Sequence, residues 1–179
     1  METFGLVCHP DHPPVAIRSV EARISAIDAA WVRLRWRIDG SDRLVVPPFA
    51  GKGRADGLWQ TTCFEMFLRN PGEVGYVELN LSPSERWAAY DFSAYRAGMS
   101  ERPFPREPDC TIRLGRTTAI FDSAVPRSAL PTLPWHYGLT AVIEEEGGNK
   151  SYWAIAHPDG PADFHHAACF AATLAAPAT

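Results

Sequence analysis

The stretch from Arg54 to Asp91 constrains the fold more than any other part of the sequence. Between Leu58 and Leu68 its residues alternate, with mainly apolar side chains on one parity and polar or aromatic side chains on the other. Successive side chains of a strand point to opposite faces, so this alternation predicts a strand with one buried face. The next residues, Asn70-Pro71-Gly72-Glu73, predict a turn, because proline presets a turn φ and glycine tolerates a positive φ. A second strand is expected from Val74 to Ser82, which completes a β-hairpin.

The expected pairing of these two strands assigns each side chain to a face. If Arg69 pairs with Val74, Glu65 lies opposite Glu78. One face is then apolar and forms core, with Phe64, Met66, Leu68, Val77, Leu79 and Leu81. The other face is polar and aromatic, with Trp59, Thr61, Cys63, Glu65, Phe67, Tyr76, Glu78 and Asn80. Cys63 is expected to be an unreactive thiol, because a neighbouring carboxylate raises a thiol pKa.

Other parts of the chain extend this β pattern. The strongest alternation covers Ala30 to Ile38, and Asp39-Gly40 predicts a hairpin turn with a returning strand from Arg43 to Val46. A second hairpin is expected between Trp135 to Glu146 and Lys150 to His157.

Length and composition favour one all-β domain. The 179 residues are 46% hydrophobic and include 16 prolines and 13 glycines, which suits many short strands and turns. We expect a single domain over residues 1–179. The predicted fold is a two-sheet antiparallel β-sandwich with about nine or ten strands and a short C-terminal helical turn.

Charge and hydropathy exclude several partners. The net charge is −4 and no run of five like charges occurs, so no nucleic-acid partner is expected. No segment reaches the ~18 apolar residues that a membrane span needs. Residues Met1 to Pro14 are expected to be an irregular lead-in without a signal sequence, which predicts a cytoplasmic protein. Four cysteines lie far apart and are expected to be free thiols. The oligomeric state is not predicted.

The polar face of the first hairpin is the strongest candidate for a binding site. Sugars are held by carboxylates and amides that hydrogen-bond their hydroxyl groups, and by aromatic rings that cover the apolar face of the sugar ring. The candidate ligand-binding residues are Arg54, Asp56, Trp59, Glu65, Glu78, Asn80 and Trp87. The alternative is an ordinary solvated sheet face. Two facing carboxylates favour a site, because like charges in a cross-strand pair destabilise a hairpin unless Arg54, Arg86 or a ligand compensates.

Catalysis by the same carboxylates is the less favoured interpretation. A retaining glycosidase needs two carboxyl groups about 5–5.5 Å apart on either side of a bond in a deep cleft. Two neighbours on one flat sheet do not provide that arrangement. The motifs G-x-S-x-G, H-E-x-x-H and G-x-G-x-x-G are also absent from the sequence.

Two further groups of residues leave alternatives open. His157, Asp163 and His165 carry imidazole and carboxylate ligands of the kind that zinc prefers, so they are a candidate metal centre or second site. Their alternative role is structural, with Asp163 capping a helical turn. A haem iron needs axial ligands, for which the candidates are Met66, Met99, His157 and His165. Met66 is excluded because its parity places it in the core.

The segments DGLWQTTCFEMFL, YVELNLSPSERWAAYDFSAYRAGM and SYWAIAHPDGPADFHH resemble the DOMON-like superfamily, in the branch similar to family 9 carbohydrate-binding modules. The likeness covers about Ala16 to Phe170, which implies a domain core at about 16–170. It implies a β-sandwich of immunoglobulin-like or jelly-roll type that binds either a sugar or a b-type haem and does not turn over a substrate. The stacking tryptophans of the family 9 modules have no residue-by-residue match in this chain.

The sequence therefore predicts a non-enzymatic protein that binds a carbohydrate or a similar small polar ligand, without a cofactor. The alternatives are a haem b-binding domain and a metal-dependent enzyme that uses the C-terminal His and Asp residues.

Overall fold

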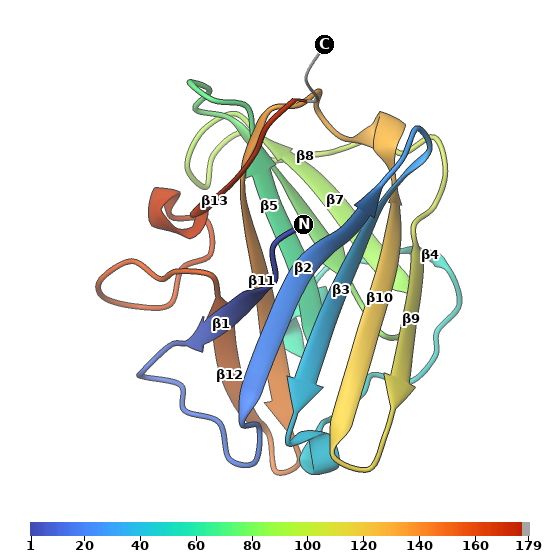
Figure 1. Ribbon diagram of the computed structural model, residues 1–179, viewed down its shortest axis with the longest axis vertical. Coiled ribbons are helices and arrows are strands. Elements are labelled where there is room, and N and C mark those ends of the chain that lie inside the picture. The colour runs from blue at the N-terminus through green and yellow to red at the C-terminus, as the bar shows by residue number, and fades with distance from the viewer. Residues whose placement is uncertain (177–179) are drawn as a thin grey trace.

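The structure is a computed structural model that describes residues 1–176 (Figure 1). Its strands are β1 (Phe4–Cys8), β2 (Ser19–Ile27), β3 (Trp31–Asp39), β4 (Gly53–Arg54), β5 (Cys63–Arg69), β6 (Tyr76–Leu81), β7 (Arg86–Phe92), β8 (Ser100–Glu101), β9 (Asp109–Leu114), β10 (Thr118–Pro126), β11 (Trp135–Glu145), β12 (Asn149–Ala154) and β13 (Ala172–Leu174). Short 3₁₀ turns are η1 (Ser41–Arg43), η2 (Leu58–Gln60), η3 (Arg127–Ala129) and η4 (Ala167–Cys169). Among the described residues, no helix is long and apolar enough to cross a membrane.

The strands form one curled sheet. Over residues 1–176 its order is β4-β7-β6-β5-β11-β12-β1-β2-β3-β10-β9, with β13 on β11 and β8 on β7. The all-β prediction is confirmed, but the expected pair of separate antiparallel sheets is not found. Strand β1 joins the two halves because it pairs with both β12 and β2, and β4 runs parallel to β7. The expectation of an irregular lead-in from Met1 to Pro14 is therefore wrong for Phe4–Cys8, whereas residues 9–14 form no strand or helix.

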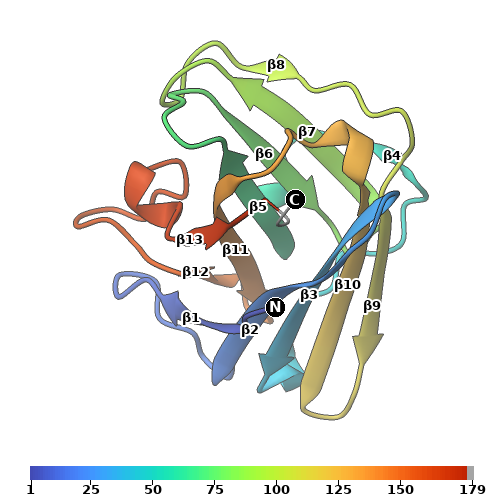
Figure 2. The ribbon, with the colours of Figure 1, turned by 45° about the horizontal axis from the view of Figure 1, so that its top comes forward.

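The core lies between the two halves of the curled sheet. Figure 2 shows β5, β6 and β7 on one side and β2, β3 and β10 on the other. Phe64 of β5 stacks on Phe121 of β10 with ring centroids 4.2 Å apart, and its ring lies 5.4 Å from that of Trp36 in β3. All three side chains are fully buried, which stabilises the fold by roughly 1.5–3 kcal/mol for each. Met66 lies in this core, as predicted.

One of the two further hairpins is confirmed and the other is wrong. Strands β11 and β12 pair from Thr140 with Ala154 to Glu145 with Asn149 and join at Gly147 and Gly148, which both have a positive φ. The returning strand ends at Ala154, before the predicted end at His157. After Asp39, however, the chain does not turn back on β3. Gly40 donates its N–H to the carbonyl of Thr117, 2.8 Å away, and η1 follows. Both edges of β3 are already paired, with β2 and β10, so a returning strand has no free edge.

The hairpin of β5 and β6 has the predicted faces but a different register. Leu68 pairs with Val77 and Glu65 pairs with Asn80, so the register differs by two residues from the expected one. The loop is longer than a tight turn, because Val74 is exposed and Gly75 packs against the backbone of β7 before β6 begins. A shift of two residues keeps every side chain on its face. The two glutamates are therefore diagonal neighbours and not a facing pair.

The C-terminal segment docks on β11. The predicted helical turn is present as η4, but its cap is His166, whose Nδ1 accepts the N–H of Ala168 at 3.2 Å, and not Asp163. Gly138 of β11 allows this docking, because a Cβ at that position would lie 2.2 Å from the backbone oxygen of Cys169.

Substitution of Gly138 by alanine is expected to destabilise the protein by about 2 kcal/mol or more, because the docked backbone would have to move. Urea unfolding measures the change. The matched control is Gly5→Ala in β1, where a Cβ meets nothing within 4 Å and the change should stay within about 0.5 kcal/mol. Equal losses in both variants would contradict the docking.

Candidate functional site

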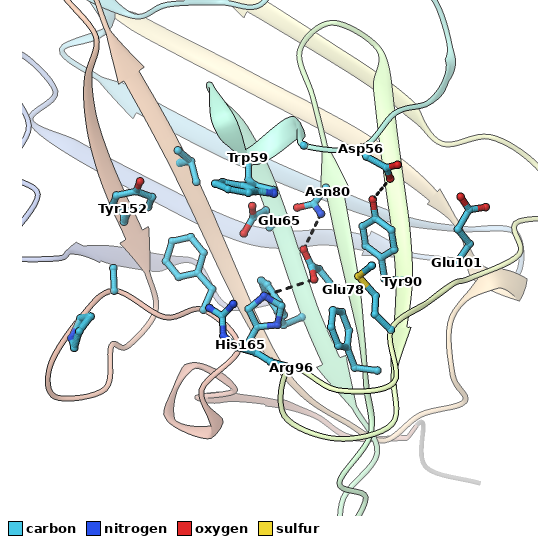
Figure 3. A pocket seen from close by; sticks show the side chains of 18 of the residues that line it. Asp56, Trp59, Glu65, Glu78, Asn80, Tyr90, Arg96, Glu101, Tyr152 and His165 are labelled. Atoms are coloured by element: carbon cyan, nitrogen blue, oxygen red, sulfur yellow. Dashed lines mark hydrogen bonds and ion pairs between the residues drawn. The ribbon is translucent and has the colours of Figure 1, made fainter.

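A groove with a volume of about 1150 Å³ lies on the face of β5, β6 and β7 that points away from the core (Figure 3). Its floor is formed by side chains that alternate with core residues along each strand: Glu65 and Phe67 from β5, Glu78 and Asn80 from β6, and Tyr90 from β7. The register places Glu65 beside Asn80 and Glu78 beside Tyr90. Strand alternation therefore builds the floor on the back of the core.

Loops and the last strands supply the walls of the groove. Figure 3 shows Tyr152 of β12 on one side of the floor and Tyr90 and Glu101 on the other. Trp59 projects from η2 and is 53% exposed, which leaves its indole ring free to contact a ligand. Arg96 and His165 lie at one end of the groove. The groove thus combines a polar floor with aromatic walls.

The polar floor is buried rather than solvated. Glu65 is 3% exposed, Glu78 is 7% exposed and Asn80 is 2% exposed. Charged side chains are almost never buried to this degree unless they are paired. An ordinary solvated sheet face is therefore the wrong interpretation of this surface.

Hydrogen bonds on the floor leave one acceptor without a donor. The side-chain amide of Asn80 donates to Glu78 Oε1 at 2.7 Å, and Thr140 Oγ1 donates to Glu65 Oε2 at 3.0 Å. Asn80 Oδ1 is buried and has no hydrogen-bond partner among the described residues. A buried polar atom without a partner costs about 1–3 kcal/mol, so the floor is set up to receive a donor from outside the chain.

Burial also changes the protonation of the floor. It raises the pKa of Glu65 to about 8, and the negative charge of Glu78 adds to the rise. Burial likewise raises the pKa of Glu78, against the hydrogen bond from Asn80. His165 lies 3.8 Å from Glu78, but burial and nearby Arg96 lower the pKa of His165 to about 4. The imidazole is therefore neutral at pH 7 and does not balance the charge of Glu78.

Two of the predicted site residues, Arg54 and Trp87, lie on the opposite face of the sheet. Trp87 is 4% exposed in the main core, and the guanidinium of Arg54 lies 4.3 Å from the centre of its ring. Arg54 also donates to the backbone oxygens of Ala89 and Arg102. The correction follows from strand parity, because Trp87 alternates with the groove residues of β7. Both side chains stabilise the fold and do not line the groove.

The other five predicted ligand-binding residues all line the groove: Asp56, Trp59, Glu65, Glu78 and Asn80. Asp56 accepts a hydrogen bond from the hydroxyl of Tyr90. This hydrogen bond fixes the wall of the groove next to β7.

His157, Asp163 and His165 do not form the expected metal centre. His157 donates to a backbone carbonyl of β1 at 2.9 Å and does not line the groove. Asp163 accepts from the hydroxyl of Tyr95 at 2.5 Å and from the guanidinium of Arg96 at 2.8 Å. In residues 1–176, no group of three His, Cys, Asp or Glu side chains is placed to hold a metal ion. Asp163 instead joins the loop after β7 to the segment after β12.

Sequence reasoning missed several lining residues: Tyr90, Arg96, Glu101, Tyr152 and Phe164. The position of Tyr90 is predictable from strand alternation, because a core position for Trp87 puts Tyr90 on the groove face. Arg96 lies in a loop with a positive φ of 50°, and loops follow no period that would reveal which side chain points inward.

Cys63 is buried, and burial and nearby Glu65 raise its thiol pKa well above the usual value, as predicted for an unreactive cysteine. The sequence predicts the raised thiol pKa from the neighbouring carboxylate of Glu65 alone, whereas burial of Cys63 is the larger cause.

Comparisons with known proteins identify a shared fold. The sequence matches no protein-family model and no curated protein. A candidate carbohydrate-binding protein from Bacteroides uniformis ATCC 8492 superimposes with a TM-score of 0.65 at 18% identity, over 97% of this chain and 85% of that chain. A family 9 carbohydrate-binding module from Caldicellulosiruptor kristjanssonii, in complex with cellotriose, has a TM-score of 0.52 at 8% identity, over 89% and 74%. The chain therefore has the fold of these two proteins.

Proposed function

We propose that the protein binds a carbohydrate in the groove and does not act on it chemically. The observation that carries the proposal is the buried floor, where Asn80 Oδ1 lacks a donor beside the carboxyl groups of Glu65 and Glu78. Sugar hydroxyls donate to such acceptors and exclude water from them. The fold shared with a carbohydrate-binding module agrees with this function.

The walls suit the other half of sugar recognition. Trp59 and Tyr152 present aromatic rings at the groove, and an aromatic ring covers the apolar C–H face of a sugar. The volume of about 1150 Å³ exceeds the roughly 300–1,000 Å³ of a typical small-molecule pocket. The groove therefore favours a short oligosaccharide over a single sugar.

Substitution of Trp59 by alanine is expected to weaken sugar binding about 10-fold or more, because the exposed ring is lost from the wall. A thermal-shift screen of mono- and oligosaccharides selects the ligand, and calorimetry then gives its Kd for both proteins. The matched control is Phe49→Ala, since Phe49 is 73% exposed and does not line the groove. No stabilisation by any sugar, or equal losses in both variants, would contradict the proposal.

Haem b is the second candidate, because Met99 and His165 both line the groove. The histidine suits an axial ligand poorly, since its Nδ1 lies 2.8 Å from the hydroxyl of Tyr76 and its Nε2 lies 3.8 Å from Glu78. An absorbance spectrum with added haemin separates the two candidates. A stoichiometric Soret band would favour haem over the sugar.

Three finer expectations stay predictions: membership of the DOMON-like superfamily, a cytoplasmic location and the lack of enzymatic activity. The shared fold with a family 9 module agrees with the first, because the branch that the sequence resembles is similar to family 9 modules.

A further inference from the structure

The floor of the groove offers more acceptors than donors. The side-chain amide of Asn80 donates one hydrogen bond to Glu78, and the hydroxyl of Thr140 donates to Glu65. Asn80 Oδ1 remains without a partner in the described chain, although the side chain is only 2% exposed. A ligand group that fits here must therefore supply a hydrogen-bond donor, and a group with several donors can also reach the carboxyl oxygens beside Asn80.

The charged residues of the groove also favour a ligand that donates hydrogen bonds. Four carboxyl groups line it, from Asp56, Glu65, Glu78 and Glu101. No lysine lines the described groove, and its one arginine, Arg96, already pairs with Asp163 at 2.8 Å. Glu65 makes no ion pair within residues 1–176. Burial raises the pKa of Glu65 to about 8, so the negative charge of the groove at neutral pH comes from the other three carboxyl groups. The groove therefore attracts a cationic ligand and repels an anionic one.

Resting on the proposed sugar binding, we propose that the groove prefers sugars that carry a free amino group, with the ammonium held at Glu65, Glu78 and Asn80. An ammonium supplies three donors where a hydroxyl supplies one. Its hydrogen bonds to carboxylates are charge-assisted and about twice as strong as neutral ones. Asn80 is a neighbour of both glutamates, because it lies opposite Glu65 of β5 and hydrogen-bonds Glu78 of its own strand, so the three side chains form one cluster for the ammonium.

Matched pairs of sugars test this preference. Calorimetry at pH 7 compares glucosamine with glucose and galactosamine with galactose, alongside N-acetylglucosamine and glucuronic acid. The amino sugar of at least one pair is expected to bind about 10-fold or more tightly than its neutral counterpart. N-acetylation should remove the gain, and glucuronic acid should bind more weakly than glucose. Glu78→Gln should lower the ratio of affinities within the pair, because the negative charge of Glu78 at the ammonium site is lost.

The possible negative results distinguish the amino preference from the proposed sugar binding. Equal binding of neutral and amino sugars would overturn the amino preference and leave the proposed function standing. No binding of these monosaccharides, together with no stabilisation by any oligosaccharide in the thermal-shift screen, would overturn the proposed function as well. Ethanolamine that binds as tightly as glucosamine would show that the site recognises an amine alone, which would contradict an amino-sugar site.

Discussion

Substitution of Glu78 by alanine is expected to abolish measurable sugar binding while the protein stays folded. Glu78 lies at the centre of the floor, where it accepts from Asn80 and faces the groove. A hydrogen bond to a charged group contributes roughly 1.5–3 kcal/mol, so loss of a carboxylate that holds two ligand donors weakens binding about 100-fold or more. Calorimetry with the selected sugar measures the loss.

Stability should change little in the same variant. Burial raises the pKa of Glu78, so the native state bears a cost for its charged form that alanine removes. That gain offsets the lost hydrogen bond, and the free energy of unfolding should change by less than about 1 kcal/mol. The control is Glu21→Ala in β2, a strand glutamate on the other half of the sheet. A Glu78→Ala variant that binds normally but unfolds easily would assign Glu78 to folding and not to binding.

Substitution of Glu65 by glutamine is expected to stabilise the protein at alkaline pH and not at acidic pH. The folded-state pKa of Glu65 is about 8, above the ordinary value of 4.5, so the native state holds a proton that the unfolded state has released. This proton stabilises the native state fully below pH 4.5, and the contribution is lost as the pH rises to about 8. The loss amounts to roughly 3–5 kcal/mol, which glutamine does not suffer.

Urea unfolding of both proteins from pH 4 to pH 9 measures this difference. His165 has the opposite dependence, because its folded-state pKa is lowered to about 4 and its stabilising effect is lost as the pH falls from about 6.5. This effect is common to both proteins and cancels in their difference. A difference that stays constant with pH would show that Glu65 is ionised and solvated, which would contradict the buried floor.

Alternation in the sequence was enough to predict the two faces of the central hairpin. Phe64 and Met66 lie in the core, and Glu65 and Asn80 lie together on the other face. This prediction is robust because the strand period is two, so even the wrong register kept each side chain on its face. The register depends on the loop, where Val74 and Gly75 lie outside the strand pairing. Gly75 packs against the backbone of β7, and the local sequence pattern does not predict this contact.

The rest of the site depends on contacts between distant segments. Tyr152 meets the floor because β12 pairs with β11, and β11 with β5. Arg96 reaches the groove because Asp163, 67 residues later, holds its loop. A strand tryptophan suits both a core and a binding site, so the sequence alone does not separate these two roles for Trp87. The pairing of β7 with β6 fixes its face. Tertiary pairing decided these positions.

Binding of a sugar on the floor of the groove is tested most directly by titration of ¹⁵N-labelled protein with the sugar selected by the thermal-shift screen, followed residue by residue. The predicted result is saturable chemical-shift changes at the indole N–H of Trp59, the side-chain amide of Asn80 and the backbone amide of Glu78. Saturable changes confined to β2, β3 and β10 on the other half of the sheet, or no saturable change with any sugar, would contradict it.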